Sequence, residues 1–197
     1  MNRGNKNVTV TDEELIRRFQ EGDKDVFPML IKRHMNMVFN LCNRMMGDYD
    51  EANDCAQETF VKIYRGLDLF KFRSSFTTWI YRIAVNNCKN RLSSSHYRFS
   101  RRAVSLDTSA DGERLPVQAG DDRSNPETRW ERDEQMSAIR TAVGSLPDDL
   151  RILVVLRDFE GRPYEDIADI CRMKLGTVKS KLARARHILR ESLKGAL

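Results

Sequence analysis

Residues 163–190 read PYEDIADICRMKLGTVKSKLARARHILR, a pattern that predicts two helices joined by a tight turn. Pro163 suits the first turn of a helix, because its fixed φ and missing N–H cost nothing there. An apolar inward stripe follows, made of Ile167, Ala168 and Ile170 or Cys171. Gly176 and Thr177 are expected to supply a flexible joint and an N-cap hydroxyl, so the second helix should start near Val178.

The second of these helices has an apolar face and a cationic face. The side chains that recur at helical spacing and can pack are Val178, Leu182, Ala185, Ile188 and Leu189. The outward ones are Lys179, Ser180, Lys181, Ala183, Arg184 and Arg186. A recognition helix needs this division, because its exposed N-terminal half must meet base edges and phosphates in the major groove. The stretch therefore predicts a helix-turn-helix that binds duplex DNA.

Charge is distributed unevenly around a net value of +5. Residues 172–194 carry eight Lys or Arg and one acid, whereas residues 131–171 carry five basic and ten acidic residues. A second basic tract spans residues 60–91, with seven Lys or Arg against Asp68 alone. Two separated cationic surfaces fit two contacts on a polyanion, although solvated helix faces give the same pattern.

The cysteines and the N-terminus indicate a reduced, cytoplasmic protein. The four cysteines are widely spaced, form no Cys-x-x-Cys motif and fall in apolar stripes: Cys42, Cys55, Cys88 and Cys171. They are expected to be reduced core residues, and no metal or cofactor is predicted. Residues 1–10 are polar and no apolar run approaches a membrane span, so neither a signal peptide nor membrane insertion is expected.

The chain up to Leu92 is nearly continuous helix signal without sustained period-two alternation, which predicts an all-α domain over residues 11–95. Thr11 or Asp12 can cap a first helix, and Pro28 lies early in a long second helix that ends near Met46. The third helix is expected over about residues 51–67, with Ala52, Cys55, Ala56, Phe60, Ile63 and Leu67 inward. The fourth is expected from Ser74 or Ser75 to Ser93–Ser95.

Residues 96–125 are rich in Ser, Asp, Gly, Arg and Pro, which is typical of a flexible linker, and residues 1–10 are expected to be a disordered tail. Pro126 then opens a helix to about Gly144, and Leu146-Pro147 opens another that Gly161 stops. With the helix-turn-helix, this makes a second four-helix domain over residues 126–197. The predicted fold class is all-α, with two small helical domains.

Aromatic and cationic residues are concentrated over residues 70–82. The aromatic ones are Phe70, Phe72, Phe76, Trp79 and Tyr81, and the cations are Lys71, Arg73 and Arg82. Flat rings can stack on unpaired bases while cations follow the backbone, and Asn86, Asn87 and Asn90 could hydrogen-bond base edges. Phe76 and Trp79 sit at core spacing and are expected to pack, which leaves Phe70 and Phe72 as the functional rings.

An acidic stretch precedes this tract, because residues 48–58 hold five acids and no base. Acids near a helix N-terminus are favoured by the helix dipole. Asp54 and Glu58 are four residues apart and so share a helix face. That face could bind a divalent metal, dock on a basic protein or simply be solvated, and docking is the favoured interpretation.

These segments resemble the bacterial sigma factors of the extracytoplasmic function (ECF) group of the sigma-70 family. DEANDCAQETFVKIYR at residues 50–65 is similar to that family's region 2.2, and FTTWIYRIAVNNCKNR at residues 76–91 to its regions 2.3 and 2.4. Residues 146–190, with LPDDLR, FEGRPYEDIA and GTVKSKLARAR, look like region 4. Three motifs in order across two domains make the resemblance specific.

The resemblance implies a non-enzymatic subunit that binds core RNA polymerase and directs promoter recognition, melting and initiation in a stress response. Its expected partners are the largest-subunit clamp and the flap of polymerase, promoter DNA, and an anti-sigma factor. The residues that match clamp-binding positions are Asp54, Gln57 and Glu58. Those that match positions at the melted minus-10 strand are Phe70, Lys71, Phe72, Arg73, Tyr81, Asn86 and Asn90. Those that match the minus-35 reading face are Thr177, Lys179, Ser180, Lys181, Ala183 and Arg184.

The sequence departs from the family pattern in the loop expected to capture a flipped base. That loop commonly reads Phe-Arg-Gly-acidic, whereas residues 70–73 read FKFR and place bulk and charge where a glycine is usual. Ala183 is small where a larger contact residue can occur, so the base preferences of both DNA-reading surfaces stay open.

Two other classes of protein also fit parts of the sequence. A stand-alone repressor or activator would bind operators as a dimer through residues 126–197. A metal-dependent nuclease would use Asp50, Asp54 and Glu58, although a third convergent ligand is hard to place. Binding of core polymerase separates the sigma factor from both.

Overall fold

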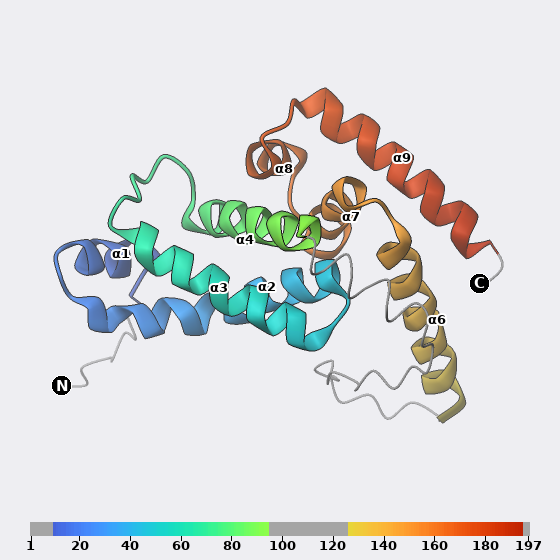
Figure 1. Ribbon diagram of the computed structural model, residues 1–197, viewed down its shortest axis with the longest axis horizontal. Coiled ribbons are helices and arrows are strands. Elements are labelled where there is room, and N and C mark those ends of the chain that lie inside the picture. Colours follow the sequence, from blue (N-terminus) through green and yellow to red (C-terminus); the bar gives the residue numbers. More distant parts are fainter. Residues whose placement is uncertain (1–9, 95–125, 195–197) are drawn as a thin grey trace, which may run out of the picture.

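The computed structural model describes residues 10–94 and 126–194, with the backbone alone over residues 126–133. Every regular element in this part of the chain is helical, and the helices form an N-terminal and a C-terminal domain, which confirms the expected all-α class (Figure 1). The expected linker, 96–125, and nearly all of the expected tail lie outside the described residues. Within those residues, no helix combines the length and apolar content that a bilayer span requires.

The first two helices begin where local chemistry predicts. α1 spans Asp12–Gln20 and opens with a reciprocal capping box, in which the Glu14 N–H donates to the Thr11 hydroxyl and the Thr11 N–H to the Glu14 carboxylate. A short 3₁₀ turn, η1 (Lys24–Val26), leads into α2, Phe27–Met46. Pro28 lies in the first turn of α2, where its missing N–H leaves no hydrogen bond unmade.

The core of the N-terminal domain lies between α2, α3 (Tyr49–Leu67) and α4 (Phe76–Ser93), which pack on one another. The apolar stripe expected on α3 is buried apart from Phe60, which is half-buried. Phe76 is buried and Trp79 is half-buried, and both pack in the core cluster as expected. Helix periodicity therefore identified the inward face of this domain correctly.

Between residues 126 and 194, the described part of the C-terminal domain contains four α-helices, as expected: α6 (Pro126–Ser145), α7 (Asp148–Val154), α8 (Tyr164–Cys171) and α9 (Leu175–Leu193). The end of α7 widens into a π-helical turn, η2 (Val155–Phe159), and Gly161 then takes a left-handed φ of 66°. The core of the domain is formed by the buried side chains Leu146, Ile152, Leu153, Leu156, Ile167, Val178 and Leu182.

The expected start of the recognition helix is wrong, because α9 begins at Leu175 rather than near Val178. The left-handed residue that ends α8 is Arg172, at φ 53° and ψ 48°, and the N-cap of α9 is Lys174 in an extended conformation. Gly176 and Thr177 lie inside the first turn, where the Thr177 N–H donates to the Lys174 carbonyl. A non-glycine residue therefore makes the turn that was expected at Gly176.

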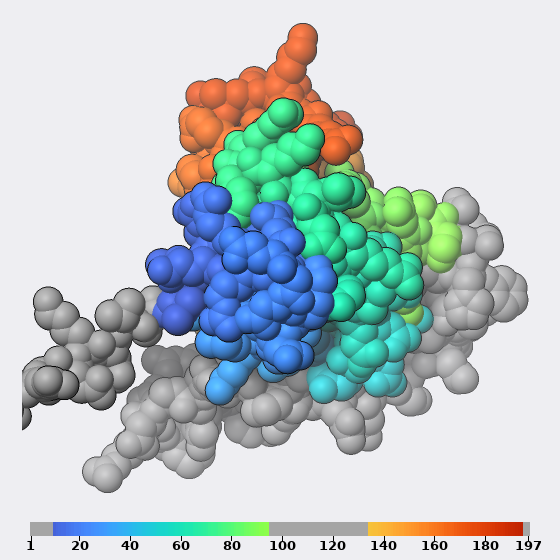
Figure 2. Space-filling view, turned by 90° about the vertical axis from the view of Figure 1, so that its left-hand side faces the viewer, coloured from blue at the N-terminus to red at the C-terminus, as the bar shows by residue number. Residues whose placement is uncertain are grey.

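The two domains pack against each other. α8 lies against α4, while α7 and η2 approach α2, and the space-filling view shows the C-terminal domain, in orange, seated on the N-terminal domain (Figure 2). Arg151 on α7 is 3% exposed and donates through Nη1 to the Met45 carbonyl at 2.8 Å. The apolar cores of the two domains join into one cluster of buried residues.

Candidate protein and nucleic-acid interfaces

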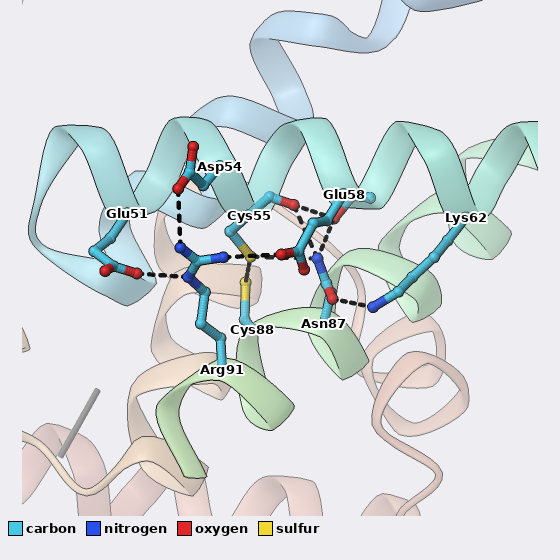
Figure 3. Close-up of polar contacts among 9 residues, drawn as sticks. Glu51, Asp54, Cys55, Glu58, Lys62, Asn87, Cys88 and Arg91 are labelled. Atoms are coloured by element: carbon cyan, nitrogen blue, oxygen red, sulfur yellow. Dashed lines mark hydrogen bonds and ion pairs between the residues drawn. The ribbon is translucent and has the colours of Figure 1, made fainter. Parts of the chain in front are cut away.

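The acidic face predicted on α3 exists, and an arginine of α4 lies against it. Asp54, Gln57 and Glu58 are all exposed. The Arg91 guanidinium donates to Glu51 at 2.5 Å, to Glu58 at 3.0 Å and to Asp54 at 3.2 Å (Figure 3). Asp54 and Glu58 therefore converge on a guanidinium, which is an arrangement suited to a basic partner.

The surroundings of Arg91 combine partial burial with a strong negative field. Burial lowers the pKa of the guanidinium, but the Glu51 hydrogen bond and the charges of Glu51, Glu58 and Asp54 outweigh it, so the pKa is raised. An open hollow of about 460 Å³ adjoins this group. Its lining residues are Glu51, Asp54, Glu58, Lys62, Asn87, Asn90, Arg91 and Ser94. The face can thus hold one cation and still offer exposed carboxylates to a second.

The three asparagines predicted for base contacts differ in their surroundings. Asn86 and Asn90 are exposed. Asn87 is 3% exposed, accepts a hydrogen bond from Lys62 and donates to the Cys55 carbonyl at 2.9 Å and to the Thr59 hydroxyl at 3.2 Å. Its amide thus ties α4 to α3, and only the exposed pair faces outward.

The loop between α3 and α4 carries the aromatic and basic residues predicted for a flipped base. Lys71 and Arg73 are exposed, but Phe70 is 6% exposed and packs on Phe72, Phe76 and Trp79, with ring centroids 4.9, 5.7 and 5.1 Å away. In this conformation the Phe70 ring is part of the core. The loop offers two cations and the half-buried Phe72 at its surface.

Phe72 adopts a backbone conformation that favours glycine. Its φ is 55°, in the left-handed region, which is uncommon for a bulky residue. Its ring packs on Phe70 and lies 4.8 Å from the Arg17 guanidinium carbon. Phe72 is the residue that the resemblance aligns with a glycine, and its left-handed φ fits that alignment. Contacts of the ring offset the strain of the conformation.

Tyr81 and Arg82 are engaged by the C-terminal domain. Tyr81 is 3% exposed, and its hydroxyl donates to Glu160 at 2.8 Å. Burial, followed by the Glu160 charge and hydrogen bond, raises the pKa of the Tyr81 phenol well above its usual range. Arg82 donates to the Asp169 carboxylate on α8 at 2.6 Å. In this arrangement of the domains the Tyr81 ring is covered, and the Arg82 guanidinium is paired with an acid of α8.

Glu160 is the centre of this contact between the domains. Its side chain is 11% exposed and accepts from Arg44 on α2 at 2.7 Å as well as from the Tyr81 hydroxyl. The Arg162 guanidinium lies over the Tyr81 ring at 5.2 Å. Glu160 and Asp169 were not singled out from the sequence, because an acid's partner in another domain leaves no local signal.

The predicted duplex-reading face of α9 is largely open. Lys179, Ser180, Ala183 and Arg184 are exposed, and Thr177 is half-buried. Lys181 is half-buried and forms an ion pair with Asp149 at the start of α7. Val178, Leu182 and Ala185 are buried on the opposite side. The helix therefore presents the division between packing and exposed faces that DNA reading requires.

Comparison with known proteins identifies two family regions in this chain. Residues 30–97 match Sigma-70 region 2, and residues 136–189 match Sigma-70, region 4. The RNA polymerase sigma-H factor of Pseudomonas aeruginosa is 38% identical over 190 residues, covering 94% of this chain and 95% of the relative. The ECF RNA polymerase sigma-E factor of Escherichia coli K12 is 38% identical over 183 residues, covering 91% and 93%.

Solved structures give the same fold. CnrH in complex with the cytosolic domain of CnrY aligns with a TM-score of 0.65 at 22% identity, covering 94% of this chain and 99% of that one. The sigma factor RpoE of Bartonella quintana, in complex with the anti-sigma factor NepR, aligns with a TM-score of 0.60 at 25% identity, covering 85% and 96%.

Proposed function

Because this chain belongs to the ECF group of the sigma-70 family of RNA polymerase sigma factors, we propose a division of labour among its surfaces. As a sigma factor it binds core RNA polymerase and directs it to promoters. The acidic face of α3 contacts polymerase, the loop after α3 and the exposed side of α4 take the melted minus-10 strand, and α9 reads the minus-35 duplex. The chain contributes binding and no catalysis, and it acts in the cytoplasm.

Polymerase binding is assigned to Asp54, Gln57 and Glu58. The supporting observation is that Asp54 and Glu58 already hold a guanidinium, at 3.2 and 3.0 Å from Arg91, while staying exposed. A basic helix of the polymerase clamp offers the same chemistry. Docking of the clamp competes with Arg91 for these carboxylates.

The minus-10 contact is assigned to the loop residues Phe70, Lys71, Phe72 and Arg73 and to Tyr81, Asn86 and Asn90 on α4. Lys71, Arg73, Asn86 and Asn90 are exposed and can meet a strand as they stand. Phe70 and Tyr81 are buried, so the loop must shift and the domains must separate before these rings can stack on a base. Base capture therefore follows an opening of the protein.

The minus-35 contact is assigned to Thr177, Lys179, Ser180, Lys181, Ala183 and Arg184 on α9. Arg184 and Lys179 are exposed and suit guanine edges or phosphates, whereas Ala183 can contribute only apolar contact. Lys181 reaches DNA after exchanging its Asp149 partner for a phosphate. This surface is the observation that carries the proposal, because Lys179, Ser180, Ala183 and Arg184 are already exposed on one face of α9 in the free chain.

An anti-sigma factor is the expected regulatory partner. RpoE, whose fold this chain shares, is described in complex with an anti-sigma factor. A partner that covers the acidic face of α3 blocks polymerase, and one that stabilises the contact between the domains keeps Tyr81 buried. Both effects oppose initiation.

Co-elution with core RNA polymerase and run-off transcription test the assignment. Asp54→Ala and Glu58→Lys are expected to lose co-elution and transcription while keeping the helical circular dichroism signal, because both side chains are exposed. Glu21→Lys, an identical charge change at an exposed site after α1, is the control and should retain both activities. Normal transcription by Glu58→Lys would contradict the assignment.

A further inference from the structure

Three of the four cysteines meet in the core of the N-terminal domain. Cys42 comes from α2, Cys55 from α3 and Cys88 from α4, and all three are fully buried and unbridged. The Cys55 and Cys88 sulfurs are 3.7 Å apart, the Cys88 and Cys42 sulfurs are 3.9 Å apart, and all three lie within 4.8 Å of one another. Figure 3 shows the Cys55 and Cys88 sulfurs facing each other between α3 and α4. The sequence, read alone, predicted these residues only as separate core thiols.

Polar groups lie close to one of the three sulfurs, that of Cys55. The Asn87 amide donates to the Cys55 sulfur at 3.6 Å, and the buried Thr59 hydroxyl donates to the Cys55 carbonyl. The amide of Asn87 thus gives the Cys55 sulfur an outer-shell contact of the kind that metal-bound ligands receive.

We propose that Cys42, Cys55 and Cys88 form a three-coordinate thiolate site for a soft monovalent d¹⁰ ion, namely Cu(I). An ion about 2.3 Å from each sulfur separates the sulfurs by about 4.0 Å in a plane and by about 3.8 Å in a tetrahedron. Two of the three sulfur separations, 3.7 and 3.9 Å, are close to this spacing before any ion binds, and the third is no more than 4.8 Å. Thiolate ligands select Cu(I) and Zn(II) over harder ions.

The number of ligands separates these two ions. Structural zinc is almost always held by four protein ligands. Among the described residues, the metal-ligating side chains gathered here are the three cysteines alone, with no histidine or carboxylate in the group. Three sulfurs without a fourth ligand therefore favour Cu(I).

Charge and protons balance without a change of oxidation state. Each thiol that becomes a ligand releases its proton to solvent, so up to three protons leave as Cu⁺ enters. Three thiolates and one Cu⁺ together carry two negative charges.

Occupation of the site has a structural consequence. One ion would join α2, α3 and α4, the helices that form the core of the domain. Binding to the folded state alone stabilises that state by mass action. The site thus makes the stability of this domain sensitive to available Cu(I), independently of the proposed contacts with polymerase and DNA.

Anaerobic titration of the full chain with Cu(I), in competition with a chromophoric Cu(I) chelator, tests the proposal. We expect one ion per chain, a sulfur-to-copper charge-transfer absorption and a rise in melting temperature. Cys42→Ala, Cys55→Ala and Cys88→Ala should each weaken binding by more than about 100-fold, the upper end of what loss of an outer-shell partner costs. Cys171→Ala, which removes the buried cysteine of the C-terminal domain, is the matched control and should bind as the unaltered chain does.

X-ray absorption of the copper-loaded unaltered chain gives a result that does not depend on the folding of any variant. Three sulfur neighbours and no nitrogen or oxygen neighbour are expected. Absence of tight binding, equal binding by Cys55→Ala and Cys171→Ala, or two or fewer sulfur neighbours would overturn the proposal. Tight tetrahedral Zn(II) binding without Cu(I) binding would contradict the three-coordinate assignment. Transcription by the copper-free chain is measured separately and reports only on the sigma function.

Discussion

The two surfaces proposed to read DNA differ in how far they are exposed in the free chain. The face of α9 is exposed at Lys179, Ser180 and Arg184, whereas on α4 Tyr81 is 3% exposed and held by the C-terminal domain. The proposed duplex-reading face is therefore accessible in the free chain, whereas part of the proposed minus-10 surface is covered. The contrast indicates an order of events in which duplex contact and polymerase binding precede base capture.

One acid, Glu160, has two polar partners within the covering contact. Glu160 accepts hydrogen bonds from both Arg44 and the Tyr81 hydroxyl at an almost buried position, and Asp169 holds Arg82 nearby. Hydrogen bonds of this kind have the greatest effect when one partner is removed, because the other is left desolvated. Single substitutions in this contact are therefore expected to change how far the proposed minus-10 surface is covered.

Glu160→Ala is expected to have the largest effect. It leaves the Arg44 guanidinium and the Tyr81 hydroxyl without this acceptor, which weakens docking of the domains by about 2–3 kcal/mol. Small-angle scattering should show a larger radius of gyration, and a fluorescent single-stranded minus-10 oligonucleotide should bind more tightly. Glu165→Ala, at an exposed position of α8, is the control. An unchanged radius would mean that this contact does not hold the domains together.

Arg184→Ala acts on the open surface. Loss of one base or phosphate contact is expected to weaken binding of minus-35 duplex by about 1–3 kcal/mol. Thermal stability should stay within about 0.5 kcal/mol, because the side chain is exposed. Arg190→Ala, also exposed on α9 but outside the predicted face, should change duplex binding less. Affinity for the duplex is measured by fluorescence anisotropy. Equal losses of affinity in the two variants would show that α9 contributes only sequence-independent electrostatic attraction to DNA.

Tyr81→Phe is expected to have an effect of about 1 kcal/mol, the typical value of one hydrogen bond. It keeps the ring in the core and removes the hydroxyl that Glu160 accepts from. The pKa of the Tyr81 phenol is raised in the folded chain, so the phenol stays protonated at neutral pH. The stability that its hydrogen bond contributes is fully present below the unfolded pKa, and it is lost only as pH rises through the higher folded pKa. Chemical denaturation should therefore give the same difference between the two proteins at pH 6 and pH 8. A difference that shrinks over this range would contradict the assignment.

Asp149→Asn is expected to have the smallest effect, below about 1 kcal/mol on stability, because the Asp149–Lys181 pair is largely exposed. The Lys181 hydrogen bond lowers the pKa of the Asp149 carboxyl below its ordinary value. The pair therefore stabilises the chain above the unfolded pKa, and this stability is lost as pH falls through the lower folded value. Without its partner Lys181 is released toward DNA. Duplex binding should become slightly tighter and more salt-dependent, and weaker binding would show that the pair positions Lys181.

Local features of the fold could be predicted from the sequence because their causes are local. The capping box of Thr11 and Glu14, the early Pro28 and the apolar stripe of α3 each depend on residues within a few positions. The turn before α9 was misplaced because Arg172 adopts a left-handed conformation that sequence rules reserve for glycine. Nothing about an arginine in the sequence indicates that Arg172 adopts a left-handed backbone conformation.

The sequence was enough to predict which residues form the candidate sites. It was not enough to predict which of them are buried or which distant residues they contact. The sequence identified Tyr81, but its burial depends on Glu160, which lies 79 residues away along the chain. Arg91 was part of a recognised motif, whereas its contacts with Glu51, Asp54 and Glu58 span 33 to 40 residues. Such pairings arise from packing of whole helices, and helix periodicity carries no information about them.

The separation of the two domains, measured by fluorescence transfer between labels at the exposed positions Leu69 and Leu175, tests the central claim most directly. Free chain, chain with core polymerase, and Glu160→Ala should be compared. The account predicts one compact distance in the free chain, a longer one on polymerase, and a shift toward the longer distance in Glu160→Ala alone. The same distance in all three samples would contradict the claim that docking of the C-terminal domain covers the minus-10 surface until polymerase binds.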